Sequence, residues 1–174
     1  MEPTQIGERL DRSTRRVTMV TMAMPVVTEA HRRLDRLVGS WKGEERLYPS
    51  PFDTQGGSAI ARVHNQRALD GFAVVQDYEQ ERDGKVRFRG HGIFRWDGED
   101  GAYTLHWFDS LGLPPSEFRG QFEGEALTLV NDGPQGMTRA VFEFGGRSYT
   151  YRMQVSPDGT NWFPFMEGAY TRED

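Results

Sequence analysis

The sequence contains no cysteine in its 174 residues. A disulfide framework, and any zinc or iron–sulfur site built on thiolates, is therefore excluded. No run approaches the roughly 20 consecutive apolar residues that a membrane-spanning helix needs, and no block is rich in Lys or Arg. The formal net charge of −5 also lacks the basic excess of nucleic-acid-binding proteins. We expect no nucleic-acid partner and no membrane partner. We also expect a cytoplasmic location, because the absence of cysteine suits a reducing compartment.

What the chain does contain favours β-structure. There are 20 glycines, nine prolines and 21 aromatic residues (11 Phe, 6 Tyr and 4 Trp). This composition is typical of an all-β domain with many turns rather than of a helical bundle. The length fits one domain that can bury a core without covalent staples.

The first 26 residues are predicted to form a flexible N-terminal arm, followed by one domain over residues 27–174. Arg15-Arg16 and the apolar stretch of residues 17–27 weakly resemble a secretory signal peptide. That stretch is interrupted by threonines and Pro25, and no small-residue cleavage site follows, so the arm is the favoured interpretation. Met22 or Met24 is an alternative start of the chain.

A short helix is predicted after the arm. Thr28 is suited to cap its start, and Gly39 occupies the position of a C′ glycine. Between them, one helical face carries Ala30, Leu34, Leu37 and Val38. A helix of this length is not stable alone, so its apolar face must pack, and we expect one end of a barrel as the partner.

Everything after Gly39 predicts short strands joined by glycine turns. The ranges are 41–48, 58–67, 72–81, 86–96, 103–110, 118–122, 127–131, 138–144, 147–155 and 162–172. About ten antiparallel strands with almost no helix between them predict an up-and-down β-barrel.

The tight turns also predict which residues face each other. A two-residue turn at Asp83-Gly84 places Asp77 opposite Gly90, and a four-residue loop at 98–101 places Gly90 opposite Asp109. The more apolar face, expected inside, then carries Ala73, Val75, Asp77, Gly90, Gly92, Phe94, Trp96, Tyr103, Leu105, Trp107 and Asp109. The other face carries Phe72, Val74, Gln76, Tyr78, Arg89, His91, Ile93, Arg95, Thr104, His106, Phe108 and Ser110.

The second face is too apolar to be wholly solvated, because it groups Phe72, Val74, Ile93 and Phe108. We expect a second copy of the chain to cover it in a homodimer, or else the N-terminal arm.

A further turn at Gly145-Gly146 places Phe142 opposite Tyr149 and Ala140 opposite Tyr151, which gives another aromatic inner stripe. Ten strands enclose more volume than eight, so we expect a cavity. Its predicted lining residues are Trp41, Trp107, Tyr151 and Met153.

Trp41 is predicted to plug the barrel base, with a late arginine such as Arg172 across its ring. Contact with a ligand is the alternative role for this tryptophan.

His91 and His106 lie within reach of each other on one predicted face. A metal would need a third ligand, and the predicted register places no carboxylate or further histidine beside them. Hydrogen-bonding or interface histidines are the favoured interpretation. If inside and outside are reversed, the two histidines line the pocket together with Gln76, Tyr78 and Arg89.

Asp77 and Asp109 flank Gly90 on the predicted inner face, about 10 Å apart across two strand spacings. Desolvation raises a carboxyl pKa, so either could act as a catalytic acid or base. Hydrogen bonds to backbone groups near the barrel mouth are the favoured alternative. Glu45 and Glu167 are further acidic candidates without assigned partners.

Several motifs from residue 37 onward resemble the lipocalin-like bacterial domain of unknown function 1579. They are Gly39-Ser40-Trp41-Lys42-Gly43, Arg67-Ala68-Leu69-Asp70-Gly71, Gln76-Asp77-Tyr78-Glu79-Gln80, Gly90-His91-Gly92-Ile93-Phe94, Trp107-Phe108-Asp109-Ser110, Ser156-Pro157-Asp158-Gly159 and Trp162-Phe163-Pro164-Phe165-Met166-Glu167-Gly168. The resemblance implies a calycin-type barrel with a small-molecule cavity and no settled activity. Glu45 departs from it, since a small residue is usual at that position.

The stretch of residues 37–49 is also similar to the start of nitrobindin, a ten-stranded haem barrel. That resemblance implies a haem-ligating histidine near the end of the last strand. The corresponding residues 165–170 contain no histidine, so we expect no cofactor by that route.

We therefore predict an intracellular binding protein for a small apolar or aromatic ligand, held by Trp107, Tyr151 and Met153. An isomerase, cyclase or hydratase that uses Asp77 or Asp109 is the alternative. A haem protein that uses His91, His106 or Met166 is a weaker one.

Overall fold

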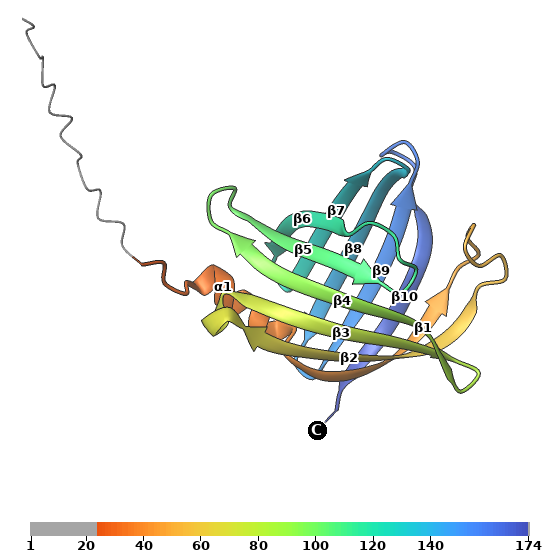
Figure 1. The fold of residues 1–174 in the computed structure, drawn as a ribbon, viewed down its shortest axis with the longest axis horizontal. Coiled ribbons are helices and arrows are strands. Elements are labelled where there is room, and N and C mark those ends of the chain that lie inside the picture. Colours follow the sequence, from red (N-terminus) through yellow and green to blue (C-terminus); the bar gives the residue numbers. More distant parts are fainter. Residues whose placement is uncertain (1–23, 174) are drawn as a thin grey trace, which may run out of the picture.

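Ten antiparallel strands form a closed barrel in the computed structural model, which describes residues 24–173 (Figure 1). Each strand pairs with the next along the chain, and β1 closes the barrel against β10. The strands are β1 (Gly39–Leu47), β2 (Gly57–Ala68), β3 (Ala73–Arg82), β4 (Lys85–Asp97), β5 (Ala102–Asp109), β6 (Ser116–Glu123), β7 (Ala126–Gly133), β8 (Gly136–Gly145), β9 (Ser148–Ser156) and β10 (Phe163–Arg172). The predicted all-β up-and-down barrel with a short helix at its start is confirmed.

The helical segment is split into two short pieces. The α-helix α1 (Glu29–Arg33) is followed by a 3-10 turn, η1 (Leu34–Arg36), where one continuous helix was predicted. Leu34 and Leu37 are buried against the barrel, and the Tyr103 hydroxyl donates a 2.9 Å hydrogen bond to the Ala30 carbonyl. The segment closes one end of the barrel, as expected. This packing stabilises a helix that is too short to be stable alone.

Burial alternates along β1 as the strand period requires. Trp41, Gly43 and Glu45 are buried, and Lys42 and Glu44 between them are exposed. Glu45 is a charged residue on this buried inner row, where apolar residues are usual.

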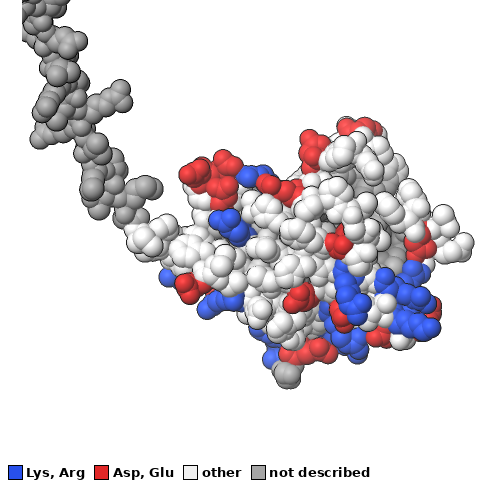
Figure 2. All heavy atoms as spheres, in the orientation of Figure 1, with Lys and Arg blue, Asp and Glu red and all other residues white. Residues whose placement is uncertain are grey.

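On the outside, acidic and basic side chains lie beside one another across neighbouring strands. Arg62 of β2 is 3.1 Å from Glu81 of β3, and Arg89 of β4 is 2.9 Å from Glu79 of β3. Figure 2 shows this mixture of signs over the visible face. These pairs are exposed and contribute little stability each.

The predicted register between β4 and β5 is correct. Gly90 pairs with Asp109, Gly92 with Trp107, and the inner face is the predicted one. The four-residue loop between the two strands therefore fixed both the pairing and the side-chain direction.

The predicted register between β3 and β4 is wrong by one residue. A β-bulge separates the Gln80–Phe88 pair from the Glu81–Val86 pair, so Arg87 is extra on β4. Asp77 consequently faces His91 instead of Gly90 and lies on the outside. Because side chains alternate along a strand, a slip of one residue exchanges the two faces. The buried row of β3 is therefore Val74, Gln76, Tyr78 and Gln80.

This exchange reduces the apolar patch that was expected on the outside. Val74 is buried inside the barrel, and the ring of Phe72 packs 5.1 Å from the ring of His31 next to the helix. Ile93 is half-buried, and Phe108 keeps 43% of its surface exposed. The homodimer remains a prediction, with less apolar surface to support it.

The turn between β8 and β9 differs from the prediction without changing the faces. Gly145 pairs with Ser148, so Phe142 faces Tyr151 and Ala140 faces Met153. The slip of two residues preserves the inner aromatic stripe because the side-chain period is two.

The predicted arm of residues 1–26 falls almost entirely outside the described residues. None of the helices described in residues 24–173 has the length and hydropathy of a transmembrane helix.

Candidate ligand cavity

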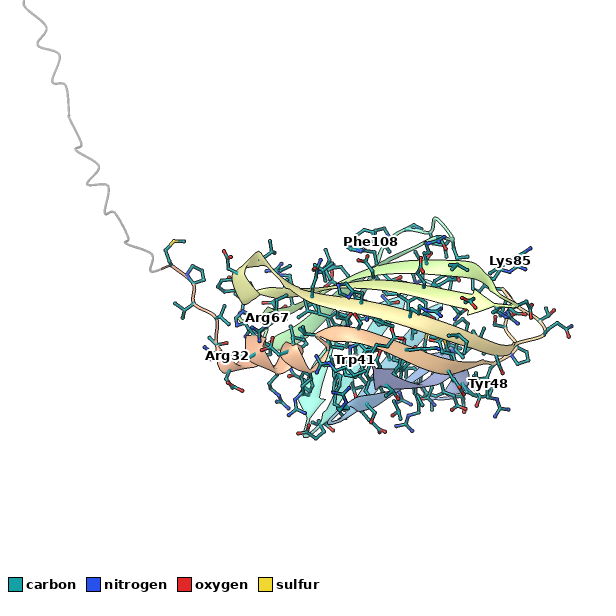
Figure 3. All side chains as sticks on the ribbon, turned by 90° about the horizontal axis from the view of Figure 1, so that it is seen from below. Arg32, Trp41, Tyr48, Arg67, Lys85 and Phe108 are labelled. Carbon is teal, nitrogen blue, oxygen red and sulfur yellow. The ribbon has the colours of Figure 1, made fainter. Side chains whose placement is uncertain are left out.

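A cavity of about 660 Å³ occupies the barrel interior. Its walls come from nearly every strand, and its rim comes from the loops that follow β1, β3 and β5. Consecutive strands of an up-and-down barrel alternate in direction, so these loops share the end opposite α1. Figure 3 shows Tyr48 and Lys85 at that end, and Arg32 and Arg67 at the other.

Trp41 seals the closed end. It is 2% exposed, its indole nitrogen donates a 2.8 Å hydrogen bond to the Leu37 carbonyl, and the Arg172 guanidinium lies 5.2 Å from its ring centroid. The predicted plug, with Arg172 as its arginine, is confirmed. Trp41 does not line this cavity. Its alternative role in ligand contact stays a prediction.

Trp107, Tyr151 and Met153 all line the cavity, as predicted for the ligand-binding residues. The indole of Trp107 lies directly over Gly90. A Cβ atom at position 90 would be 2.1 Å from that ring, so only glycine accommodates the tryptophan in this position.

Aromatic rings form a nearly continuous wall. Tyr78 lies 6.0 Å from Trp107, and Phe142 lies 4.8 Å from Tyr151, measured between ring centroids. A third pair, Tyr149 and Tyr170, is stacked at 4.5 Å. Such arrangements combine a large apolar surface with polar edges.

Glu45 is the one carboxylate buried in the core of the described chain, with 3% of its surface exposed. The Tyr78 hydroxyl lies 2.9 and 2.8 Å from its two carboxylate oxygens, and the Gln80 amide nitrogen donates at 2.8 Å. The Tyr170 hydroxyl donates a further short hydrogen bond to it. Tyr78, Gln80 and Tyr170 line the cavity, and Glu45 lies behind them.

Burial raises the pKa of the Glu45 carboxyl, while the hydrogen bonds from Tyr170, Gln80 and Tyr78 oppose that rise. Burial also raises the pKa of Tyr78 and of Tyr170 well above the usual range, and the nearby Glu45 charge raises both further. The two tyrosines therefore stay protonated and act as donors. Among the described residues, no Lys, Arg or His forms an ion pair with Glu45.

Sequence reasoning named Glu45 without partners and assigned Tyr78 and Gln76 to the outer face. The unpredicted bulge caused the second error. One pattern could have indicated the site: Trp41, Gly43 and Glu45 follow each other at period two, which places an acidic side chain on the inner row.

Asp109 lies at the cavity mouth, where one of its oxygens accepts a 2.9 Å hydrogen bond from the Leu111 backbone amide. Asp109 therefore makes the backbone hydrogen bond near the barrel mouth that the sequence favoured over a catalytic role. Asp77 points away from the cavity and lies 2.8 Å from the Nδ1 atom of His91. The predicted pair of inward carboxylates at Gly90 is therefore wrong, because the bulge turns Asp77 outward.

His91 and His106 both lie on the outer face, so neither lines the cavity. His91 contacts Asp77, and the Nδ1 atom of His106 is 4.0 Å from a carboxylate oxygen of Glu117. The expectation that no carboxylate lies beside them is wrong, since the same register error hid Asp77. Residues 24–173 nevertheless contain no group of three His, Cys, Asp or Glu side chains arranged to hold a metal ion.

The cavity does not fit haem ligation by histidine. No histidine occurs among the described residues that line it. Met166 does line it, with its sulfur 3.7 Å from the Gln80 amide nitrogen. We derive no haem chemistry from this site.

A family model described as "Protein of unknown function (DUF1579)" matches residues 27–172. The chain belongs to this family. The lipocalin-like family predicted from the motifs is thereby confirmed. A comparison with curated proteins gave no match.

Two solved structures are similar to this member of the family. Rv2717c from M. tuberculosis shares 16% sequence identity at a TM-score of 0.67, over 86% of this chain and 100% of that one. The S-type phycobiliprotein lyase CPES from Guillardia theta shares 10% identity at a TM-score of 0.56, over 84% and 94% of the two chains. At these identities the likeness shows a common barrel fold.

Proposed function

We propose that this DUF1579 member binds a small, largely apolar or aromatic molecule inside the barrel. The observation that carries the proposal is the cavity, which is closed at the helix end and open at the other. Its volume of about 660 Å³ lies within the range of roughly 300–1,000 Å³ typical of small-molecule sites.

Unpartnered polar groups in the wall support the proposal. Gln76 is 6% exposed and Tyr149 is 3% exposed, and both line the cavity. Neither side chain has a hydrogen-bond partner among residues 24–173. Neither residue contributes to the fully buried polar atoms without a partner in the described chain, so their polar groups stay accessible in the cavity. A guest that bonds to them gains orientation.

The rim offers an apolar entrance. Phe52, Leu111 and Leu113 line the mouth and keep 66%, 54% and 54% of their surfaces exposed. Exposed apolar side chains grouped at an opening are typical of ligand entry sites.

Titration with N-phenylnaphthylamine, a neutral apolar fluorophore that brightens in dry surroundings, tests the proposal. We expect saturable binding to the full chain. Ala140→Phe adds a ring to the cavity wall and should weaken binding at least tenfold. Val141→Phe adds the same ring one residue along on the outer face and should leave binding within about threefold. No saturable binding, or equal effects of the two variants, refutes the proposal.

The enzymatic alternative retains Asp109 as its one predicted carboxylate in the cavity. Barrels of this shape serve enzymes too, since one similar structure is named a lyase. However, the Asp109 carboxylate already accepts a backbone hydrogen bond, and this structural role favours the binding function.

A further inference from the structure

We infer that the ligand is an organic cation, an amine or quaternary ammonium on an apolar body, held among the aromatic rings with Glu45 as its counter-charge. This inference rests on the proposed function and names the chemical class that the same cavity selects. It follows from an acidic group without an ion-pair partner directly behind the wall, the aromatic surface in front of it and the placement of the cations.

Glu45 has no basic side chain as an ion-pair partner among residues 24–173. All its contacts come from neutral donors: the Tyr78 and Tyr170 hydroxyls and the Gln80 amide. Burial disfavours the ionised carboxylate, and the three donors directed at it offset part of that cost. A buried charge of this kind is costly until a cation approaches, and attraction in a site poor in water exceeds that at the surface.

The aromatic wall suits a cation for an independent reason. Tyr78, Trp107, Tyr149, Tyr151 and Tyr170 all border the cavity. The negative faces of such rings attract ammonium groups within about 6 Å, and several rings around one space form the cages that recognise quaternary ammonium ligands.

In the described part of the chain, the cationic side chains that line the cavity are Arg82 and Arg87, and both lie at its mouth. Arg82 forms an ion pair with Asp53 and donates a 2.6 Å hydrogen bond to the Gly56 carbonyl, and Arg87 is exposed. An anionic ligand would therefore find no partner charge beside Glu45, and a carboxylate would be repelled there.

Glu45 acts as a positioning residue. It does not line the cavity itself but holds the hydroxyls and the amide that do. The Tyr78 oxygen already accepts a 2.9 Å hydrogen bond from the Gln80 amide nitrogen. The Tyr170 hydroxyl donates to Glu45, so its oxygen keeps lone pairs that a ligand can use. An ammonium N–H group can donate to the Tyr170 oxygen while its charge faces the carboxylate behind it.

Three naphthyl ligands with a cationic, a neutral and an anionic head group test the inference at about pH 8: naphthylmethylamine, naphthylmethanol and naphthoate. Each competes with N-phenylnaphthylamine for the full chain. We expect the amine to bind at least tenfold more tightly than the alcohol and the naphthoate to bind more weakly than both.

Glu45→Gln should reduce the amine-to-alcohol ratio to within about threefold while N-phenylnaphthylamine still binds. The matched control is Glu44→Gln, which removes the same charge from the adjacent exposed residue outside the barrel wall. It should leave the ratio unchanged.

The unmodified protein gives a second measurement should Glu45→Gln fail to fold. Acidification to about pH 5 protonates part of a carboxyl whose pKa is raised, so the amine preference should shrink. The titratable groups that face Glu45 are Tyr78, Tyr170, Tyr149 and Tyr151, all with raised pKa values, so none of them changes charge between these pH values.

The outcomes separate the two proposals. If N-phenylnaphthylamine binds but the amine is not preferred, or Glu45→Gln keeps the preference, the cation inference is wrong and the binding function stands. If neither the fluorophore nor any of the three ligands binds, both proposals fail.

Discussion

Replacing Tyr170 by phenylalanine removes one hydroxyl from the cavity wall and keeps the ring. That hydroxyl donates to the buried Glu45 carboxylate. Hydrogen bonds to charged groups contribute roughly 1.5–3 kcal/mol to folding. We expect Tyr170→Phe to lower the free energy of unfolding by about this amount.

Tyr149 provides a matched control. Its ring stacks on that of Tyr170 at 4.5 Å, and both residues are 3% exposed. The Tyr149 hydroxyl has no hydrogen-bond partner among residues 24–173. Tyr149→Phe should therefore change the free energy of unfolding by less than about 0.5 kcal/mol.

Equilibrium unfolding in urea, followed by tryptophan fluorescence, measures both variants. At roughly 2–4 °C per kcal/mol for a domain of this size, the Tyr170→Phe loss corresponds to about 3–12 °C in Tm. The loss should also diminish towards acid pH, because the removed bond is strongest to ionised Glu45. Equal losses for the two variants, or a Tyr170→Phe loss that grows on acidification, would refute the assigned role of Glu45.

Four further predictions follow from the same geometry. Because the pKa of Glu45 is raised above its usual value of 4.5, the protonated carboxyl favours the folded state; this stabilisation is complete below pH 4.5 and is lost as pH rises through the folded-state pKa. Glu45→Gln should flatten this decline in the free energy of unfolding, measured in urea from about pH 4 to 8. Gly90→Ala should displace the Trp107 ring, shift tryptophan emission and weaken N-phenylnaphthylamine binding at least tenfold, whereas unchanged spectra would contradict the close ring contact. Asp109→Asn should leave the fluorophore's affinity within about threefold, whereas a loss of turnover of about a hundredfold would favour the enzyme. Light scattering after size exclusion tests the homodimer, and a monomer at micromolar concentration would contradict it.

Much of the barrel was predictable because its information is local. Alternating apolar residues and glycine turns set all ten strands, and the loop at 98–101 set the pairing of β4 with β5. Prediction from local sequence failed at Arg87, because nothing in the neighbouring residues distinguishes a bulge from a regular hairpin.

The sequence by itself determined the strands, the inner rows of β4 and β5, and the tryptophan that closes the base. Only the tertiary structure decided that Glu45 meets Tyr78 and Tyr170, which lie 33 and 125 residues further along the chain. The reason is physical. Closure of the barrel pairs β1 with β10, which brings Tyr170 to Glu45. The extra residue in β4 shifts the pairing of β3 by one, so Tyr78 faces inward and not outward as predicted. The chemistry of the cavity thus depends on distant pairings that no local pattern encodes.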